Sequence, residues 1–313
     1  MIRVTTGSRL HFGLIGLGAD APRRFGGVGL MVQDPGLCVC ASPAAEWSAS
    51  GPLAERALDF AQRFAESAHC NHPQHLVVQQ APAQHVGLGT GTQLGLAVGR
   101  ALATACGLNL TATQLAAHVG RGLRSALGIH GFERGGFLVD GGKGGDEEVA
   151  PLIVRVDFPT EWCILLAIPD TEPGLHGRDE QQAFADLVAS QAASGRADSL
   201  CRLALLGMLP ALAERDCTVF GGALYEFNRR VGEVFSTVQG GIYAGPGPSA
   251  LVDWFRQQGV SGVGQSSWGP TVFAVVADEE TGRNLAARLT RQTGTSRVRV
   301  VVTAARNVGA TVS

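Results

Sequence analysis

The chain has 313 residues, which is enough for two domains or for one large domain with a substantial buried core. Hydrophobic residues make up 45% of it and charged residues 17%, so the composition indicates a globular and rather apolar protein. The formal net charge is −2, so no basic face for nucleic-acid binding is expected.

The cysteines and the N-terminus indicate a cellular compartment. Seven cysteines, an odd number with no CxxC pair among them, favour reduced and packed thiols over a disulfide framework. The N-terminus has no apolar signal core behind a basic start, and no apolar stretch reaches membrane-spanning length. We therefore expect a cytoplasmic protein with no membrane partner and no nucleic-acid partner.

The first half of the chain predicts a small sheet followed by helices. Short β-forming runs separated by Gly and Pro in the first forty residues are typical of hairpins. Residues 53–68 carry apolar side chains at helical spacing, and residues 76–80 read as a strand. Helices are expected over 94–106 and 113–123, whereas the glycine-rich residues 125–145 predict tight turns rather than a long helix.

The second half predicts helices between strands. A buried strand is expected at 162–169, a strand within 262–276 and a last strand at 297–304. The helical patterns cover residues 179–194, 199–215, 219–235, 246–258 and 279–293. Because the order is not a regular βαβ alternation, the fold class is α+β.

The most informative stretch is the glycine-rich loop PAQHVGLGTGTQLG, residues 82–95, which lies between a predicted strand and a predicted helix. Glycines let a backbone approach a ligand closely, and a helix N-terminus offers unpaired N–H groups to an anion. No GK[ST] follows and the spacing is not GxGxxG, so the loop suggests phosphate binding without fixing the chemistry. A glycine-rich turn with an ordinary Thr cap is the alternative. The candidate phosphate- or pyrophosphate-binding residues are Gly87, Gly89, Thr90, Gly91, Thr92 and Gln93.

Three segments in this order resemble the motifs of the GHMP small-molecule kinase superfamily: residues 8–17, 82–93 and 262–275. The resemblance implies a two-domain fold, with a left-over-right β/α N-terminal domain and an α/β-plait C-terminal domain. We place the domains at residues 1–156, which carry the phosphate loop, and 157–313.

Four stretches are similar to one branch of that superfamily, the β-ribofuranosylaminobenzene 5′-phosphate synthases. They read RLHFGL, GLGTGTQLGLAVGRAL, GIHGFERGGFLVDGG and GQSSWGPT. The resemblance implies a phosphoribosyl transferase that condenses phosphoribosyl pyrophosphate with 4-aminobenzoate or 4-hydroxybenzoate, losing CO₂ and pyrophosphate in tetrahydromethanopterin biosynthesis. It also implies a homodimer. The residues alone do not choose between the two acids.

One position separates this chain from the related kinases. Those kinases often carry a catalytic Asp in a G-I-D turn, whereas the comparable turn here is Gly128-Ile129-His130. The difference favours a synthase, because a C–C bond-forming reaction has no hydroxyl nucleophile to deprotonate. An ATP-dependent GHMP-type kinase and a non-catalytic binding module remain the alternatives.

The segment around that turn supplies the candidate catalytic residues. Its polar side chains lie among glycines and apolar residues, a density that packing does not readily explain. Either of its carboxylates is a candidate ligand for Mg²⁺, which would neutralise the leaving pyrophosphate. A turn residue is the plainer interpretation of Asp140. The candidate catalytic residues are His130, Glu133, Arg134 and Asp140, with Glu133 and Asp140 as candidate metal ligands.

The candidate substrate-binding residues come from several segments. Arg9 and His11 are two apart on a predicted strand, so both side chains face the same side. An arginine suits a phosphate or a carboxylate, and a tryptophan can stack on an aromatic acid or simply complete the core. The candidates are Arg9, His11, Arg24, Arg178, Gln265, Ser266, Ser267 and Trp268.

Overall fold

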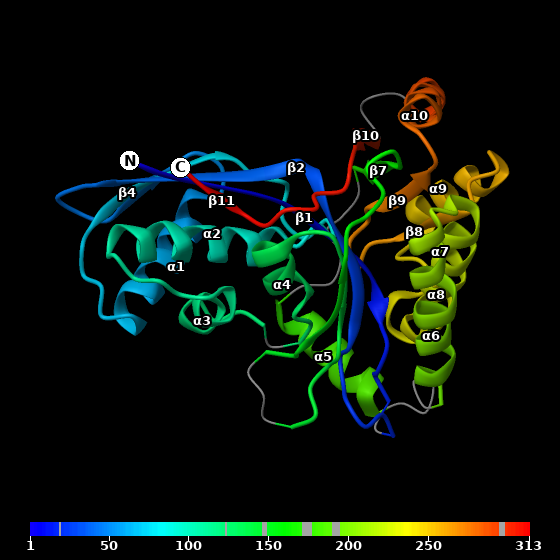
Figure 1. Cartoon of the computed structure of the whole chain (residues 1–313), viewed down its shortest axis with the longest axis horizontal. Helices are drawn as coiled ribbons and strands as arrows, with labels where there is room; N and C mark the ends of the chain where they lie inside the picture. The colour runs from blue at the N-terminus through cyan, green and yellow to red at the C-terminus, as the bar shows by residue number, and fades with distance from the viewer. Residues whose placement is uncertain (19, 123, 146–148, 171–176, 190–194, 294–297) are drawn as a thin grey trace.

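The structure is a computed structural model of the chain, and it describes every residue except 19, 123, 146–148, 171–176, 190–194 and 294–297. Two sheets with their helices form two lobes (Figure 1). The α+β class and the two-part architecture expected from the sequence are confirmed.

The first sheet is built on two long antiparallel strands, β1 (Ile2–Leu14) and β2 (Gly27–Pro43). The short β-forming runs expected in the first forty residues lie within or next to these two longer strands, which continue through register shifts. Along its length β2 pairs first with β5 (Phe137–Asp140) and then with β4 (Gln74–Gln80). The sheet is completed by β3 (Ser48–Ser50), β6 (Leu152–Val156) and β11 (Thr311–Val312).

Four helices pack below this sheet in Figure 1: α1 (Ala54–Ser67), α2 (Thr90–Ala105), α3 (Ala112–His118) and α4 (Leu127–Arg134). The second of them, α2, is rich in Ala, Gly and Leu, and most of its residues are buried between the sheet and its neighbours. Small residues allow that close approach. The helix expected after the glycine-rich loop is therefore confirmed, and it begins within the loop itself.

The second sheet has the antiparallel order β10-β7-β9-β8. Its strands are β7 (Cys163–Pro169), β8 (Gly262–Gln265), β9 (Val272–Val276) and β10 (Val298–Thr303). The central strands are apolar throughout because both faces are covered. Ile164 and Phe273 pack with α8 (Cys217–Gln239), whereas Leu165 lies in the core shared with α9 (Pro246–Gln257) and α10 (Glu279–Thr293).

The remaining helices of this lobe surround α8. They are α5 (Gly177–Ala189), α6 (Ala197–Leu203), the π-helical turn η2 (Ala204–Met208) and α7 (Leu209–Glu214). The single helix expected over 199–215 is thus interrupted by a π-helical turn. No helix in the described part of the chain is long and apolar enough to cross a membrane.

The two halves of the sequence do not separate completely in space. β6 ends at Val156 and β7 begins at Cys163, so the boundary expected at 156/157 falls between the two sheets. The C-terminal strand β11, however, returns to pair with β1 in the first sheet.

Two expectations differ from the structure. Residues 127–134 form the helix α4 where tight turns were expected. Gly128 and Gly131 let this helix lie close to Thr92 and Met31, and this packing outweighs the low helix propensity of glycine. Cys70 and Cys106 form a disulfide with Cα atoms 6.5 Å apart, so the expectation of thiols alone is wrong for this pair. They meet because α1 and α2 pack together and each cysteine follows the end of one helix.

Candidate active site

Three segments far apart in the sequence meet at one place through hydrogen bonds. The N–H of Arg9 donates to Leu88 O at 3.0 Å, which joins β1 to the glycine-rich loop. The N–H of His11 donates to the Ser266 hydroxyl oxygen at 3.0 Å, and that hydroxyl donates to Gly87 O at 2.7 Å. The Ser266 side chain therefore bonds both β1 and the loop, and it is fully buried.

The glycine-rich loop and the β8–β9 turn touch through their backbones. A methyl group added at Gly87 would lie 2.2 Å from Ser266 O, and one added at Gly269 would lie 2.1 Å from Gly87 N. Only glycine allows this approach at either position. The Thr271 hydroxyl also donates to Val86 O, at 2.5 Å. The loop from one lobe is thus fixed against the turn from the other.

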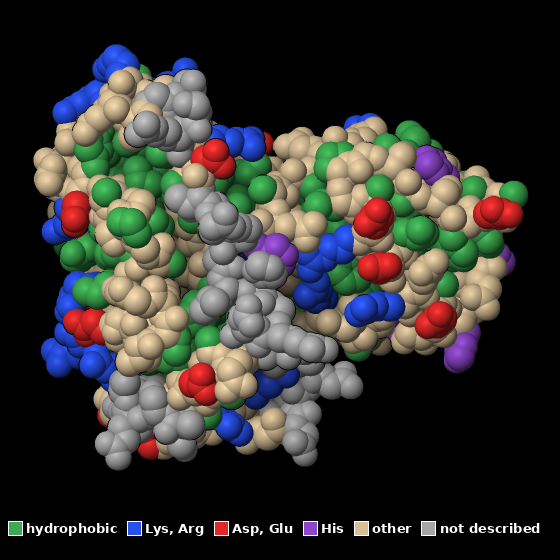
Figure 2. Space-filling model, turned by 180° about the vertical axis from the view of Figure 1, so that it is seen from behind, with side chains coloured by type: hydrophobic (Ala, Val, Ile, Leu, Met, Phe, Trp, Pro, Cys, Tyr) green, Lys and Arg blue, Asp and Glu red, His purple; other side chains and the backbone are tan. Residues whose placement is uncertain are grey.

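A cavity of about 490 Å³ lies at this junction. Figure 2 shows Lys or Arg side chains next to a histidine in the hollow between the lobes. The described lining contains two histidines and four arginines but no Asp or Glu. The arginines are Arg9, Arg56, Arg121 and Arg124, and the histidines are His11 and His85.

One end of the cavity carries positive charge from a helix N-terminus and an arginine. Helix α2 begins here at Thr90, after Gly89 in the left-handed conformation with φ 70°. A helix N-terminus carries partial positive charge and directs its first N–H groups outward. The Arg9 side chain lies 3.3 Å from the Cβ position of Gly89. The residues from Gly87 to Thr92 all line the cavity.

Two further arginines converge on the first turn of α2. A methyl group at Gly91 would lie 2.6 Å from Nη2 of Arg56 and 2.9 Å from Nη2 of Arg121. Both guanidinium groups also lie over the Phe60 ring, at 5.8 and 5.0 Å from its centroid. The two guanidinium groups approach the same point beside Gly91, where their positive charges repel each other. An anion bound between them would offset that repulsion. Together with Arg9 and the helix N-terminus, they form a site suited to a polyanion such as pyrophosphate.

His11 lies between the two ends of the cavity. Burial, and secondarily the charge of Arg9, lower the pKa of His11 well below its usual value, so the imidazole is neutral near pH 7. Its Nε2 lies 3.3 Å from the Cβ position of Gly27, where β2 begins. A neutral ring does not repel a cation that develops next to it.

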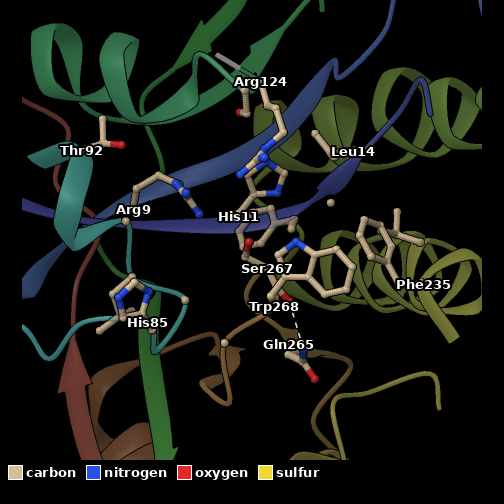
Figure 3. Close-up of a pocket in the computed structure, with 18 of the residues that line it drawn as sticks. Arg9, His11, Leu14, His85, Thr92, Arg124, Phe235, Gln265, Ser267 and Trp268 are labelled. Atoms are coloured by element: carbon tan, nitrogen blue, oxygen red, sulfur yellow. Dashed lines mark hydrogen bonds between the residues drawn. The ribbon is translucent and has the colours of Figure 1, made fainter. Parts of the chain in front are cut away.

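The other end of the cavity is aromatic. Trp268 lies edge-to-face against Phe235 and Phe184, with ring centroids 4.6 and 5.3 Å away. Figure 3 shows Arg9 and Thr92 on one side of His11 and Phe235 and Trp268 on the other. Val231, Ile242 and Tyr243 complete this wall. The cationic end therefore comes mainly from the N-terminal half of the chain, and the aromatic end from the C-terminal half.

Asn228 joins the two halves beneath the cavity. Its Nδ2 donates to Phe12 O at 2.7 Å and to Gln265 O at 2.9 Å, and its Oδ1 accepts from Gln265 N at 2.9 Å. Gln265 Oε1 in turn accepts from Ala244 N at 2.7 Å. The Asn228 amide thus joins α8 to β1 and β8, and the Gln265 amide joins β8 to the loop after α8.

The structure brings most of the predicted binding residues to the cavity. Its lining includes five of the six phosphate-loop candidates and five of the eight substrate-binding candidates: Gly87, Gly89, Thr90, Gly91, Thr92, Arg9, His11, Gln265, Ser267 and Trp268. Gln93, the sixth candidate, is buried and links α2 to its neighbours. Its Oε1 accepts from the Thr6 hydroxyl, and its Nε2 donates to Gly128 O. Ser266 holds the motifs together, as described above.

Two predicted arginines are not placed in the lining. Arg24 is exposed, and its backbone forms an isolated antiparallel β-bridge with the backbone of Lys143. Arg178 falls in the first turn of α5, and its side chain lies outside the described part of the structure.

Three of the predicted catalytic residues lie away from this cavity. The Nε2 atom of His130 is 2.8 Å from Ala150 O, a contact that fixes α4 to the loop before β6. Glu133 lines a different cavity, next to Arg100, and Arg134 is exposed. The likeness to a G-I-D turn suggested His130, but α4 is a helix whose polar residues point elsewhere.

Asp140 lies behind the cavity wall, with both carboxylate oxygens occupied. Oδ1 accepts from the N–H groups of Gly27 and Gly142, and Oδ2 accepts from Ser125 Oγ and Ala126 N. Burial raises the pKa of Asp140, and these hydrogen bonds oppose the rise. The carboxylate thereby positions Ser125, which does line the cavity.

The described residues that line the cavity include no carboxylate to hold a magnesium ion. They contain no cluster of three or more His, Cys, Asp or Glu side chains placed to hold a metal. Of the predicted ligands, Glu133 lines a different cavity, and Asp140 is fully hydrogen-bonded behind the cavity wall. The positive charge of the described lining comes from guanidinium groups instead.

Sequence reasoning missed Arg56, Arg121 and Arg124. Arg56 lies on the exposed-looking face of a predicted helix, where an arginine carries no signal of function. Arg121 lies between Gly120 and Gly122 in a short connection between helices. An arginine between two glycines was the one feature of the sequence that could have indicated a binding role. The aromatic residues of α5 and α8 fall within predicted helices, where the sequence does not distinguish a core side chain from one that lines a cavity.

Comparison with known proteins identifies the fold and the family of the chain. The family model described as "GHMP kinases C terminal" matches residues 208–295. Over the full length, mevalonate diphosphate decarboxylase from Enterococcus faecalis has the same fold, with a TM-score of 0.66 at 16% identity and coverage of 100% of this chain and 98% of that one.

Two curated relatives are nearer in sequence, and both are named β-ribofuranosylphenol 5′-phosphate synthase. The one from Methanothermobacter thermautotrophicus is 33% identical, over 98% of this chain and 97% of the relative. The one from Archaeoglobus fulgidus is 34% identical, over 99% and 98%. The chain belongs to the β-ribofuranosylphenol 5′-phosphate synthase family, on a GHMP kinase fold.

Proposed function

We propose that this protein condenses phosphoribosyl pyrophosphate with 4-hydroxybenzoate, releasing CO₂ and pyrophosphate, as a β-ribofuranosylphenol 5′-phosphate synthase of tetrahydromethanopterin biosynthesis. The observation that carries the proposal is the two-ended cavity. Its arginine- and glycine-lined end suits a pyrophosphate, and its aromatic end suits a benzoate ring. The names of the relatives, which specify a phenol product, support the hydroxy acid over the amino acid.

The cationic end favours departure of the pyrophosphate. As the C1′–O bond breaks, its electron pair goes to the pyrophosphate, whose charge Arg9, Arg56 and Arg121 would neutralise. C1′ gains oxocarbenium character, as in glycoside cleavage. The neutral imidazole of His11 next to it avoids the repulsion that an imidazolium would exert.

The aromatic end places the acceptor on the opposite side of C1′. The ring carbon that bears the carboxylate supplies the electron pair for the new C–C bond, which inverts C1′ and gives the β product. The bond from that carbon to the carboxylate then breaks, CO₂ leaves, and the pair restores the aromatic ring. No proton is gained or lost overall.

Magnesium remains a proposal in a restricted form. Because the described lining offers no carboxylate, we propose that a divalent cation reaches the site as part of the substrate, bound to the phosphates of phosphoribosyl pyrophosphate. No step above depends on it.

Carboxyl-labelled 4-hydroxybenzoate tests the function. With phosphoribosyl pyrophosphate and Mg²⁺ but without ATP, we expect labelled CO₂ in equal amount to pyrophosphate, and none when phosphoribosyl pyrophosphate is omitted. Parallel reactions with 4-aminobenzoate measure the preference between acceptors. ADP formation from ATP with an alcohol acceptor, and no CO₂, would instead assign the chain to the GHMP-type kinases.

A matched pair of variants links the activity to the cavity. Arg121→Met removes one of the guanidinium groups at α2, so we expect KM for phosphoribosyl pyrophosphate to rise about tenfold or more. Arg283→Met removes an exposed arginine of α10, whose side chain is 71% exposed, and should leave that KM unchanged. Equal effects of both variants would contradict the assignment of the anion site.

A further inference from the structure

One arginine of the cavity lining lies at the aromatic end, apart from the anion site at α2. The guanidinium carbon of Arg124 is 4.4 Å from the centroid of the Phe184 ring, whereas two of the arginines at α2 lie over Phe60. Phe184 in turn lies edge-to-face against Trp268, with ring centroids 5.3 Å apart. A guanidinium stacked on a ring points its N–H groups outward in its own plane, where a carboxylate can accept two of them. Arg124 therefore brings a charged donor to the aromatic wall.

The indole N–H of Trp268 is a second donor in the same wall. Its Nε1 is buried, in a side chain only 5% exposed, and no described residue accepts a hydrogen bond from it. Trp268 lines the cavity, and Figure 3 shows its indole nitrogen on the side of His11 rather than of Phe235. A buried donor without an acceptor is costly, so this N–H indicates an acceptor that a ligand supplies.

The same two kinds of side chain occur elsewhere in this lobe, where the protein itself satisfies both. Arg256 lies over the Tyr225 ring, 4.3 Å from its centroid, and donates to two backbone carbonyl groups. Nε1 of Trp254 donates to Gln292 Oε1 at 2.6 Å. Neither Arg256 nor Trp254 belongs to the described lining of the cavity. The open donor of Trp268 is therefore a feature of the cavity and not of buried indoles in general.

The charge of the pair suits a carboxylate better than a phosphate. Arg124 carries one positive charge and Trp268 offers a neutral N–H, so together they match a group with one negative charge. A phosphate ester carries about two negative charges near pH 7, and a pyrophosphate carries more. The three arginines and the helix N-terminus at the other end of the cavity supply that larger positive charge.

The position of the pair matches the place that the reaction requires for a carboxylate. In the proposed condensation the ring carbon that bears the carboxylate bonds to C1′, which we place near His11. Figure 3 shows the Arg124 side chain extending toward His11, as the Trp268 nitrogen does from the other side. The next residue, Ser125, has its Oγ 3.2 Å from the Cβ position of Gly27, and His11 Nε2 is 3.3 Å from the same position. The two donors thus lie at the part of the wall nearest to the reacting carbon.

We propose that Arg124 and the Nε1–H of Trp268 form the subsite that binds the carboxylate of the acceptor. The assignment rests on the proposed function and adds to it the residues that select an aromatic acid. The guanidinium supplies the charge, and the indole N–H fixes the orientation of the carboxylate. Once CO₂ has left, the aromatic part of the product has no negative charge for Arg124, which favours release of the product.

Calorimetric binding of three matched ligands tests the pair without relying on turnover. They are 4-hydroxybenzoate, 4-hydroxybenzamide, which keeps the shape but removes the charge, and phenol, which lacks the group altogether. Each is titrated in the presence of saturating pyrophosphate. We expect wild-type protein to prefer the acid to the amide about tenfold or more, Arg124→Met to lose most of that preference, and Arg124→Lys to retain part of it. Trp268→Phe should weaken the acid and the amide about fivefold, and phenol less, because only the first two offer an oxygen to the indole N–H.

Matched controls come from the satisfied pair in the same lobe. Arg256→Met and Trp254→Phe remove the same groups from side chains outside the described lining, and should leave all three affinities unchanged. Arg124→Met should also bind phosphoribosyl pyrophosphate as wild-type protein does, because the phosphates of that substrate lie at the other end of the cavity.

The outcomes separate this proposal from the proposed function. An unchanged preference for the acid over the amide in Arg124→Met overturns the role of Arg124. Weaker phosphoribosyl pyrophosphate binding in that variant, with the preference intact, would assign Arg124 to the 5′-phosphate instead. Equal weakening of all three ligands in Trp268→Phe overturns the role of Trp268.

The activity of wild-type protein completes the comparison. If it releases CO₂ but the ratios of affinities do not move in the variants, only the carboxylate subsite fails. If it neither binds 4-hydroxybenzoate nor releases CO₂, the proposed function fails as well.

Discussion

A methyl group added at Gly91 would displace two arginines of the proposed anion site, so this residue offers a direct test of that site. Its Cβ would meet the ends of Arg56 and Arg121, which are flexible and can move aside. We expect Gly91→Ala to leave the free energy of unfolding unchanged or raise it by up to about 1 kcal/mol, since alanine favours a helix. The same change should weaken phosphoribosyl pyrophosphate binding about tenfold, because the guanidinium groups are displaced.

Gly222→Ala is the control for that prediction. Gly222 lies within α8, and a methyl group there would meet nothing within 4 Å. This variant should gain helix stability without changing ligand binding. Denaturant unfolding and calorimetric titration measure the two quantities. A loss of binding in both variants, or in neither, would contradict convergence of the two arginines on a phosphate.

His11 gives the molecule a pH dependence with a definite sign. Its folded pKa lies below that of the unfolded chain, so the unfolded state binds the extra proton first as the pH falls. We therefore expect the free energy of unfolding to decrease as the pH falls below about 6.5, by at most about 1.4 kcal/mol per pH unit from this group. His11→Gln should flatten the curve between pH 7 and pH 5. Denaturant unfolding at several pH values measures it, and equal slopes in the two proteins would show that His11 is not buried and neutral.

Among the residues of the site, those with a local sequence pattern could be predicted, and those brought there by tertiary contacts could not. Arg9, His11 and the glycine-rich loop carry local patterns, namely strand alternation and clustered glycines before a helix, and the structure places them at the cavity. His130 was singled out by likeness to a turn, yet it bonds Ala150 O away from the cavity. Arg56 reaches the site only because α1 packs beside α2, a tertiary contact with no local signal.

At the scale of elements, the contact between the glycine-rich loop and the β8–β9 turn decides whether the cavity forms. Gly269→Ala would place a methyl group 2.1 Å from backbone atoms of Val86 and Gly87, which cannot move aside as a side chain can. We expect a loss of stability of about 2 kcal/mol or more, in the range of overpacked core sites, together with weaker phosphoribosyl pyrophosphate binding. Thermal unfolding and titration measure both. Wild-type values for both would mean that the loop and the turn are not in contact.

Most elements could be predicted because their patterns are local. The strand β4, the helix α2 and the helices α9 and α10 follow directly from apolar periodicity and from Pro or Gly at their ends. The helix α4 could not, because glycines lower helix propensity and only contact with Met31 and Thr92 explains their use. The disulfide between Cys70 and Cys106 likewise depends on helix packing that spacing does not encode.

At the scale of the whole molecule, each lobe contributes a different kind of side chain to the cavity. The first supplies positive charge and a helix N-terminus, and the second supplies an aromatic wall. Under the proposed function, both lobes are needed to place a pyrophosphate and an aromatic acid on opposite sides of one carbon. The expected homodimer and cytoplasmic location stay predictions from the sequence.

The charge of the cavity predicts how a divalent cation behaves. Because the described lining holds arginines and no carboxylates, we expect free protein to bind Mn²⁺ weakly, and tightly only when phosphoribosyl pyrophosphate is present. Electron paramagnetic resonance of Mn²⁺, titrated with and without the substrate, distinguishes the two states. Tight stoichiometric binding by the free protein would reveal a carboxylate site that this lining does not contain.

A crystal structure of the protein with phosphoribosyl pyrophosphate tests the central claim most directly. The account predicts the pyrophosphate at the N-terminus of α2, contacted by Arg9, Arg56 and Arg121, with C1′ near His11 and open toward Phe235 and Trp268. A pyrophosphate bound elsewhere, or a C1′ facing away from the aromatic wall, would contradict the division of one cavity into a phosphate end and an acceptor end.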